Sequence, residues 1–440
     1  MRIRALGAAL TVMTAMSSAG ATLRAEGLTA DEQRIVAAVA ADAPGALALL
    51  ERVVNINSGT MNFAGVRLVG EVFEAELKAL GFDPEWVDGT PFGRAGHLVA
   101  RRSGSGRRLL LVGHLDTVFE PDSPFQRFER ISETGARGPG IIDMKGGDVI
   151  IVSALKALSA VGVLETADIT VVMTGDEEDM GEPQALARRH LQDAARGADV
   201  VLAFENGAGD PRQAVVARRG HTEWTLKVTA RPAHSSQVFG TAVGAGAIFE
   251  AARVLHAFYE KLSDEPPLTL SPGLVLGGTT VAFDVQQSRG TAFGKSNVVP
   301  EHAVVVGDLR AASPRQLDAA KAAMREIAAA GLPHATSALS FVDGYPPMAR
   351  TPGNDRLLAM YDRASRDTGA GPVTAVDPDK AGAADVAFVA GQVPMILDGI
   401  GLMGDGGHTV NETADLRTLP TQMKRAALLL YRLSQQGAGR

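Results

Sequence analysis

The chain contains no cysteine among its 440 residues. Disulfide bonds, thiolate zinc sites and a cysteine nucleophile are therefore excluded. Neither sign of charge predominates strongly, since 43 Lys and Arg stand against 50 Asp and Glu, for a net charge of −7. Because no basic stripe appears, nucleic acid is not expected as a partner. The remaining composition, 45% hydrophobic and 21% charged, is ordinary for a globular protein.

Long apolar runs are scarce, and the first one is too short to span a membrane. Residues 5–16 are mostly apolar, but they fall short of the ~20 apolar residues that a transmembrane helix needs. Arg2 and Arg4 precede this run, and Ala-Gly-Ala at residues 19–21 follows it as a small-x-small cleavage site. We therefore expect residues 1–25 to be a signal peptide of an exported, periplasmic protein with no membrane anchor.

The segment Leu-Leu-Leu-Val at residues 109–112 is predicted to be a strand buried on both faces. Such strands belong to parallel sheets flanked by helices, and these sheets bind ligands at the carboxyl ends of their strands. His114 and Asp116 stand at that end. A histidine steered by a carboxylate is typical of a metal ligand, although a capped turn or an ordinary polar strand end gives the same pattern.

Three further segments place carboxylates next to predicted strands or helices. Asp143 follows a Gly-Pro-Gly turn and precedes an apolar helix predicted at 149–164, where a helix N-cap is the alternative. An acidic cluster at 176–179 follows a predicted strand at 169–174, and Glu205 ends another at 200–205. Acidic clusters are commonly solvated, but carboxylates crowded after a buried strand are costly unless cations neutralise them.

The order of predicted elements indicates two kinds of domain. Helices at 30–54 and 65–80 and strands at 92–101 and 109–112 follow an α/β rhythm. From residue 222 onward, strands at 222–229, 281–286 and 303–310 and helices at 243–262 and 313–330 predict a compact α+β module. The α/β texture then returns and ends with a helix at 419–433. We expect an α/β domain at 26–220 and 341–440, interrupted by a module at 221–340.

Five segments in order resemble the signatures of the M20 family of dizinc metallopeptidases, closest to its exported glutamate carboxypeptidase (carboxypeptidase G-type) branch. They are Gly-His-Leu-Asp-Thr at 113–117, Gly-x-Gly-x-x-Asp-x-Lys-Gly-Gly at 138–147, Asp-Glu-Glu at 176–178, Phe-Glu at 204–205, and His408. The resemblance implies a zinc-binding α/β catalytic domain, with a mixed sheet flanked by helices, interrupted by a smaller α+β lid or dimerisation domain.

The resemblance also implies a ligand set for two zinc ions per chain. His114 and Glu205 would bind one ion, Glu178 and His408 would bind the other, and Asp143 would bridge both. Nitrogen and oxygen ligands without sulfur suit Zn²⁺, and Co²⁺ or Mn²⁺ would also be accepted.

Two neighbouring carboxylates then take catalytic roles by the same resemblance. Glu177 would act as the general base on a water that bridges the two metal ions. Asp116 would orient His114 from behind the metal.

The predicted lid supplies residues that face the substrate. His234 resembles the lid histidine that reaches the partner's active site in a homodimer and stabilises the oxyanion; a capped surface histidine is the alternative. Asn297 and Arg310 match substrate-binding positions. A guanidinium that holds a carboxylate is what a carboxypeptidase needs, while a structural salt bridge is the alternative for Arg310.

Two segments depart from the glutamate-releasing relatives, and both belong to substrate binding. Tyr345 stands where those relatives have an arginine, and Ala-Gly-Ala-Ala-Asp at 381–385, which includes Gly382, replaces a Gly-Gly-Gly-Thr-Asp run. Arg350 lies close enough in sequence to replace the missing charge. We expect the hydrolytic chemistry to be intact and a preference for neutral over acidic C-terminal residues.

The predicted function is hydrolysis of a peptide or N-acyl amino acid at the amide next to a free carboxylate. A dizinc aminopeptidase or a dipeptidase is the nearest enzymatic alternative, and an aminopeptidase would need an acidic group to hold a substrate ammonium. An exported solute-binding protein with two α/β lobes is the alternative from another class.

Overall fold

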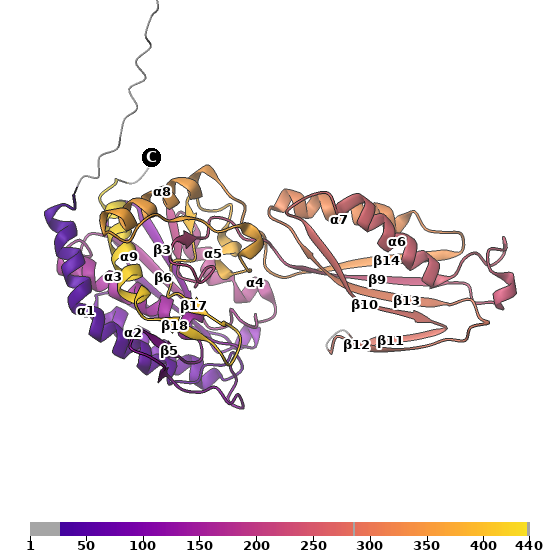
Figure 1. Cartoon of the computed structure of the whole chain (residues 1–440), viewed down its shortest axis with the longest axis horizontal. Helices are drawn as coiled ribbons and strands as arrows, with labels where there is room; N and C mark the ends of the chain where they lie inside the picture. The colour runs from indigo at the N-terminus through magenta and orange to yellow at the C-terminus, as the bar shows by residue number, and fades with distance from the viewer. Residues whose placement is uncertain (1–26, 285–286, 438–440) are drawn as a thin grey trace, which may run out of the picture.

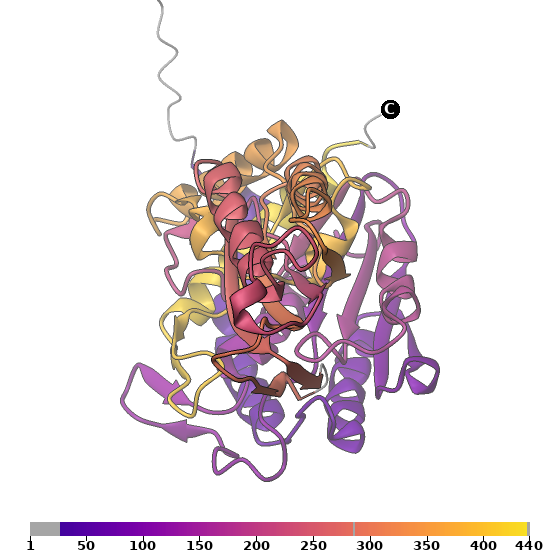
Figure 2. The same ribbon diagram turned by 90° about the vertical axis from the view of Figure 1, so that its right-hand side faces the viewer.

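The computed structural model describes residues 27–284 and 287–437, so the predicted signal peptide lies outside the described residues. The described chain forms two lobes that are joined at residues 218–221 and 344–348, which we call the connecting segments (Figure 1). The smaller lobe extends away from the larger one, and Figure 2 views the molecule from the end of that smaller lobe. The larger lobe is therefore built from sequence on both sides of the smaller lobe.

A six-stranded mixed sheet forms the centre of the larger lobe. Its strands, in spatial order, are β1 (Asp83–Asp88), β2 (Gly96–Arg102), β6 (Asp168–Thr174), β3 (Arg108–His114), β7 (Val200–Ala203) and β16 (Ile396–Leu397). β3, β6, β7 and β16 run parallel, while β1 and β2 are antiparallel to their neighbours. The carboxyl ends of β3, β6 and β7 consequently open on the same edge of the sheet.

Both faces of this sheet are buried, as predicted for β3. Leu109 and Leu111 belong to one apolar cluster, and Leu110 and Val112 belong to another on the opposite face. The first cluster is covered by α1 (Ala30–Val54), α2 (Phe63–Ala79), α3 (Gly146–Ala160), α8 (Pro352–Asp367) and α9 (Thr418–Ser434). Short helices cover the second, namely α4 (Gln184–Ala187), α5 (Arg189–Ala195) and η5 (Asp385–Val389).

Helix α1 begins with a capping box, in which Thr29 and Glu32 each accept a hydrogen bond from the other's backbone N–H. Among the described residues α1 is the one helix that is long and apolar enough, by length and composition, to cross a membrane. It packs against α3 and α9, and side chains such as Ile35 and Leu50 are fully buried in the core.

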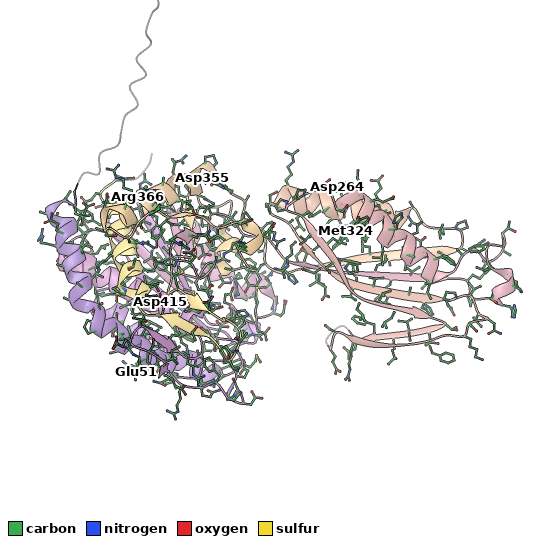
Figure 3. The ribbon with its side chains drawn as sticks, in the orientation of Figure 1. Glu51, Asp264, Met324, Asp355, Arg366 and Asp415 are labelled. Atoms are coloured by element: carbon green, nitrogen blue, oxygen red, sulfur yellow. The ribbon has the colours of Figure 1, made fainter. Side chains whose placement is uncertain are left out.

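The smaller lobe is a four-stranded antiparallel sheet with two helices on one face. The sheet order is β10 (Thr269–Gly278), β13 (His302–Arg310), β9 (Thr222–Ala230) and β14 (Ala335–Asp343). α6 (Ala247–Leu262) and α7 (Pro314–Ala329) cover it, and Met324 of α7 is fully buried (Figure 3). A hairpin of β11 (Thr280–Asp284) and β12 (Arg289–Phe293) extends from the edge strand β10. The α+β architecture predicted for this module is confirmed.

Small elements line the rim of the larger lobe near the ends of β3, β6 and β7. A second sheet contains β17 (Gly404–Asp405), β18 (Thr413–Asp415), β5 (Gly135–Arg137) and β4 (Glu129–Arg130), and β15 (Thr374–Ala375) pairs with β8 (Gln213–Ala214). Single turns of the larger lobe are η1 (Thr90–Phe92), η2 (Ile141–Lys145) and η4 (Pro378–Lys380), while η3 (Ser235–Gln237) follows β9 in the smaller lobe. These elements carry several of the polar side chains described below.

Two predicted elements begin later than expected. The strand expected at 92–101 begins only at Gly96, because η1 occupies residues 90–92 and Gly93 turns the chain with a positive φ of 69°. The lid helix expected from residue 243 begins at Ala247, after Gly244 and Gly246 at φ of 79° and 84°. In both places glycines in the left-handed region start the element later than the apolar pattern suggests.

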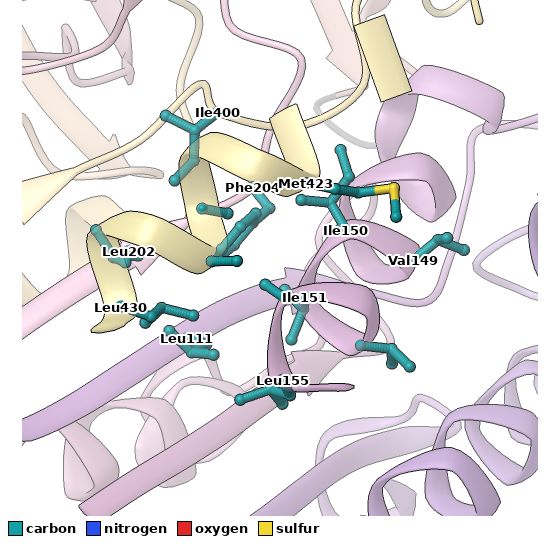
Figure 4. Packing of buried hydrophobic residues seen from close by; sticks show 14 of the residues in the cluster. Leu111, Val149, Ile150, Ile151, Leu155, Leu202, Phe204, Ile400, Met423 and Leu430 are labelled. Carbon is teal, nitrogen blue, oxygen red and sulfur yellow. The ribbon is translucent and has the colours of Figure 1, made fainter. Parts of the chain in front are cut away.

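The core between the sheet and the helices is continuous. Leu111 of β3 and Leu202 of β7 pack with Ile151 and Leu155 of α3 and with Leu430 of α9 (Figure 4). Phe204 lies in the same cluster, one residue before Glu205. The backbone that carries Glu205 is therefore fixed by close packing of buried side chains.

Candidate metal centre and active site

Two histidines and three carboxylates from five segments converge beyond the carboxyl ends of β3, β6 and β7. They are His114 at the end of β3, Asp143 in η2, Glu178 after β6, Glu205 after β7, and His408 between β17 and β18. Their ligand atoms form two triples in which all atoms lie within 4.8 Å of one another: His114, Asp143 and Glu205, and Asp143, Glu178 and His408. The two triples share Asp143.

Asp143 presents one carboxylate oxygen to each histidine. Its Oδ1 lies 3.1 Å from Nε2 of His114, and its Oδ2 lies 3.0 Å from Nε2 of His408. Nε2 of His114 is also 3.4 Å from Glu205, and Nε2 of His408 is 3.1 Å from Glu178. This geometry places a single carboxylate between two sets of donors, as a bridging ligand requires.

The donor set fits divalent cations. Oε1 of Glu178 is buried and has no hydrogen-bond partner, which is costly for a carboxylate unless a cation lies beside it. Burial raises the pKa of Glu178 to about 7 and also raises the pKa of Glu205. Hydrogen bonds with Asp143 and Glu178 raise the pKa of His408 to about 11, which reflects the negative charge around its imidazole. Imidazole nitrogens and carboxylate oxygens without sulfur suit zinc, cobalt or manganese.

From the buried interior of the larger lobe, Asp116 supports His114 and the two glutamates that follow β6. It is fully buried, and its Oδ1 lies 3.4 Å from Nδ1 of His114. The same carboxylate accepts hydrogen bonds from the backbone N–H groups of Glu177, at 3.0 Å, and Glu178, at 3.1 Å, and from the hydroxyl of Thr60, at 2.7 Å. Asp116 therefore fixes both the imidazole and the backbone that carries the two glutamates.

Glu177 lies next to both triples and belongs to neither. A ligand atom of Glu177 is within 4.8 Å of ligand atoms of His114 and Glu178. Burial raises its pKa well above the usual range of a glutamate. A carboxylate at this place is close enough to exchange a proton with a water held between the two triples.

Glu412 holds the loop that presents Asp143, and sequence reasoning missed this role. Its carboxylate is buried and accepts hydrogen bonds from the backbone N–H groups of Gly140, Ile142 and Asp143, at 3.0, 2.9 and 3.3 Å. The N-cap alternative for Asp143 is wrong, because α3 begins at Gly146 with Lys145 as its N-cap. The only sequence signal for Glu412 was its place four residues after His408 in a glycine-rich loop.

Two buried arginines, also missed, support the backbone around the cluster. Arg218, in a connecting segment, forms an ion pair of 2.7 Å with Asp398 and donates to the carbonyl of Gly382 at 2.6 Å. Asp398 in turn accepts a hydrogen bond from the backbone N–H of Glu205 at 3.4 Å. Gly382, a predicted substrate-binding residue, is thus attached through its carbonyl to the support of a candidate metal ligand.

The second buried arginine is Arg188. It pairs with Asp176 at 2.5 Å and with Asp385 at 2.7 Å, and all three side chains are almost completely buried. Its Nη2 also donates to the hydroxyl of Tyr345 at 3.4 Å. That hydroxyl donates to the backbone carbonyl of Glu177. Tyr345 is predicted to line the substrate site. Its hydroxyl nevertheless points toward the backbone of Glu177, the candidate base.

The predicted lid residues lie apart from this cluster within one chain. His234 is exposed at the far end of β9, where its Nδ1 accepts a hydrogen bond from the backbone N–H of Ser236 at 3.2 Å. Asn297 is its neighbour, since the Asn297 carbonyl accepts a hydrogen bond from Ser235 at 2.9 Å. Nine residues of β9 separate His234 from the connecting segments, roughly 27 Å of extended strand.

Arg310 lies at the opposite end of the smaller lobe, next to the connecting segments. It is the last residue of β13, and Ala311 accepts a hydrogen bond from Gly220 at 2.8 Å. Its Nε is 2.8 Å from the carboxylate of Asp308. Arg310 is thus placed on the side of the larger lobe, with its guanidinium half exposed and one carboxylate partner.

The sheet edge, the Asp143 carboxylate shared by the two triples and the adjacent buried Glu177 are typical of a metal-dependent hydrolase, and comparison with known proteins agrees. Residues 110–433 match the model of Peptidase family M20/M25/M40. The chain is 28% identical over 409 residues to carboxypeptidase G2 of Pseudomonas sp. (strain RS-16), covering 90% of each chain.

Solved structures show the same fold. Aminopeptidase PepT from Bacillus cereus superposes with a TM-score of 0.69 at 17% identity, covering 88% of this chain and 98% of that one. The YXEP protein of Bacillus subtilis, described as a dinuclear metal binding peptidase of the M20 family, gives a TM-score of 0.60 at 14% identity, covering 90% and 99%. The chain belongs to the M20 peptidase family. It is a hydrolase of peptide or amide bonds, which rules out the solute-binding protein.

Proposed function

We propose that the chain is a two-metal amidohydrolase that releases an amino acid with a free α-carboxylate, as a carboxypeptidase or an N-acyl-amino-acid amidohydrolase does. The observation that carries this proposal is the position of Glu177 beside two ligand triples that share Asp143. The 28% identity to carboxypeptidase G2 supports the carboxypeptidase assignment.

The proposed ligand set assigns His114 and Glu205 to one zinc ion and Glu178 and His408 to the other. Asp143, whose two carboxylate oxygens face the two histidines, would help to hold both ions. When bound, the ions supply Lewis acidity and make a water molecule acidic enough to attack at neutral pH.

Glu177 moves the protons in the proposed reaction. Its carboxylate accepts a proton from the attacking water as the new C–O bond forms at the amide carbon. It then donates that proton to the amide nitrogen as the C–N bond breaks, so the amine leaves neutral and Glu177 regains its charge. Asp116 keeps His114 and the backbone of Glu177 in place during both steps.

The smaller lobe provides the remaining substrate contacts in this proposal. Arg310 holds the α-carboxylate of the substrate with two parallel hydrogen bonds. His234 stabilises the oxyanion, and Asn297 binds the substrate beside it, both in the active site of the partner in a homodimer. The separation of His234 from the metal ligands of its own chain supports an action in trans.

The same proposal covers domain organisation and export. Residues 26–220 and 341–440 form the catalytic domain, and residues 221–340 form the lid through which two chains associate. Residues 1–25 direct export of the enzyme to the periplasm. These assignments are consistent with the two lobes of Figure 1 and with the N-terminal sequence.

The proposed specificity is for neutral or apolar released residues over glutamate. Arg188, which contacts Tyr345, already pairs with Asp176 and Asp385, and the buried Arg218 pairs with Asp398. Arg350 pairs at 2.8 Å with Asp355, which lies on α8 at the periphery of the larger lobe (Figure 3). An acidic side chain left unpaired would lose ~1–3 kcal/mol of interaction.

A single assay series tests both the chemistry and the specificity. One N-acyl group is joined in turn to Glu, Leu, Phe and Ala, and kcat/KM is measured for the zinc-loaded wild type and for Glu177→Gln. Glu177→Gln should retain two metals per chain and lose roughly 100- to 10,000-fold in kcat. The Glu substrate should be roughly 10- to 100-fold poorer than the Leu substrate.

Two results would contradict the proposal. A wild-type kcat in the metal-loaded Glu177→Gln variant would remove Glu177 as the base. A preference for free-amino substrates lacking a nearby carboxylate would favour the aminopeptidase, the activity named for the PepT fold relative.

A further inference from the structure

We propose that Tyr345 is a positioning residue for the general base: its hydroxyl fixes the peptide unit between Glu177 and Glu178 from the connecting segment. This inference rests on the proposed function, because it takes Glu177 as the base. It differs from the role expected from the sequence, in which Tyr345 contacts the substrate.

The hydroxyl of Tyr345 has protein partners for both its donor and its acceptor capacity. It donates to the backbone carbonyl of Glu177 and accepts from Nη2 of Arg188 at 3.4 Å. A phenolic hydroxyl has one proton and can accept through its lone pairs, so these two contacts satisfy it. The ring packs against Phe388 with 5.2 Å between the centroids, which fixes its direction.

The peptide unit that Tyr345 contacts is held at both of its polar ends. Its carbonyl, from Glu177, accepts from Tyr345, and its N–H, from Glu178, donates to Asp116 at 3.1 Å. This unit joins the proposed base to a proposed metal ligand. Asp116 also accepts from the N–H of Glu177 at 3.0 Å. Without the Tyr345 hydroxyl, the carbonyl of Glu177 would be free to change its orientation, while the N–H of Glu178 would remain fixed by Asp116.

Arg188 holds the hydroxyl of Tyr345 in a fixed position. The guanidinium is held by Asp176 at 2.5 Å and by Asp385 at 2.7 Å, and a hydrogen bond of 3.0 Å reaches the carbonyl of Asp176. Asp385 is itself held by the hydroxyl of Thr174 at 2.6 Å, on the last residue of β6. The hydroxyl of Tyr345 therefore lies between a rigid ion-pair network and the carbonyl that it fixes.

Tyr345 also connects this network to the smaller lobe. Its own carbonyl accepts from the N–H of His221 at 2.8 Å, and Gly344 donates back to His221 at 3.0 Å. Gln184 donates to the carbonyl of Gly344 at 3.1 Å. The residue that fixes the base thus belongs to one of the two connecting segments, so the base is supported from the junction between the lobes.

The test compares two tyrosines that each lose a buried hydroxyl. Tyr345→Phe should keep two metals per chain and its KM within about twofold, and should lower kcat roughly 10- to 100-fold, because a misplaced catalytic group loses rate without losing binding. Tyr361→Phe is the matched control, since its hydroxyl donates to Gln422 at 2.9 Å within the core of the larger lobe. That variant should keep the wild-type kcat and KM.

A double variant separates this inference from the proposed function. If Tyr345 acts through Glu177, Tyr345→Phe should cause no further loss of kcat in the Glu177→Gln background, because the two effects are not independent. Additive losses, a rise in KM at unchanged kcat, loss of metal, or a wild-type kcat in Tyr345→Phe would each overturn the positioning role. A fully active Glu177→Gln would instead overturn the proposed function, whatever Tyr345→Phe does.

Discussion

At the scale of single residues, the main energetic cost of the site is the burial of several negative charges. The carboxylate of Asp143 has an oxygen within 4.8 Å of a carboxylate oxygen of Glu178 and another such contact with Glu205, and burial raises the pKa of the two glutamates. Two divalent cations opposite three carboxylates and a hydroxide would bring the total charge to zero. Metal binding and the stability of this arrangement are therefore coupled.

Glu412 provides a prediction at this scale. Its carboxylate accepts three backbone hydrogen bonds around Asp143, and a glutamine offers only one oxygen for them. Glu412→Gln should weaken metal affinity roughly 10- to 100-fold, as loss of support behind a metal ligand typically does. Competitive titration with a chelator measures this.

The control for that prediction is another buried glutamate. Glu250 in the smaller lobe also accepts a backbone hydrogen bond, from Leu332 at 3.0 Å, and pairs with Arg253 at 2.7 Å. Glu250→Gln should lower thermal stability and leave metal affinity at the wild-type value. Equal metal affinity in Glu412→Gln and in the wild type would show that the Asp143 loop holds its position without the Glu412 carboxylate.

At the scale of elements, the site depends on how closely α3 approaches the ends of the strands. Gly147, in the first turn of α3, lies against the strand segment that carries Glu205. A Cβ at Gly147 would come within 2.0 Å of the carbonyl oxygen of Phe204 and 2.8 Å of Met144. The helix can thus pack here only with a glycine, and the position of Glu205 depends on that contact.

Two helical glycines should respond in opposite directions to the same substitution. Gly147→Ala should destabilise the protein by ~1–3 kcal/mol, because the helix must shift away from Phe204. Gly45→Ala should stabilise it by ~0.5–1 kcal/mol, because Gly45 is inside α1 and a Cβ would meet only the side chain of Asp42, at 3.4 Å. Urea unfolding curves of the two variants provide the free energies of unfolding.

The metal content of the same variants is a second measurement. Gly147→Ala should also bind less than two metals per chain, since the shift displaces Glu205 or Asp143. Gly45→Ala should bind two. A Gly147→Ala protein with wild-type stability and full metal content would show that α3 can move without disturbing the site.

At the scale of the whole molecule, the two lobes separate the proposed functional groups. The proposed metal ligands all lie in the larger lobe, while His234 and Asn297 lie at the end of β9 and β13 that is remote from the connecting segments. Arg310 lies at the near end. One chain therefore supplies Arg310 to its own site in the proposal and His234 to the site of its partner.

Mixed dimers test that arrangement. His234→Ala and Glu177→Gln chains should each be nearly inactive, but a heterodimer would contain one site with both an intact Glu177 and an intact His234. Random subunit exchange would restore about a quarter of the wild-type sites, because half of the dimers are mixed and one of their two sites is complete. No gain of activity, with exchange demonstrated by mass spectrometry, would place His234 in its own chain's site.

The sequence by itself determined the inner strands β3, β6 and β7, the mixed α/β class and the set of side chains that meet at the ends of those strands, but not β1, β10 or β14. Buried strands such as β3 are continuous apolar runs, and the ligand-type residues follow them directly, so both are local features of the chain. It did not determine where glycines with positive φ delay an element, as at Gly93 and Gly246.

Only the tertiary structure decided which side chains support the site. Arg188 and Tyr345 are 157 residues apart, and Glu412 and Gly140 are 272 residues apart, so no short pattern could connect them. Their roles come from a specific packing that brings a buried charge or hydroxyl to a particular backbone group. A hydrogen bond forms only when the donor–acceptor distance lies within a range of a few tenths of an ångström. Between residues this far apart in the sequence, only the folded lobes bring donor and acceptor to that distance.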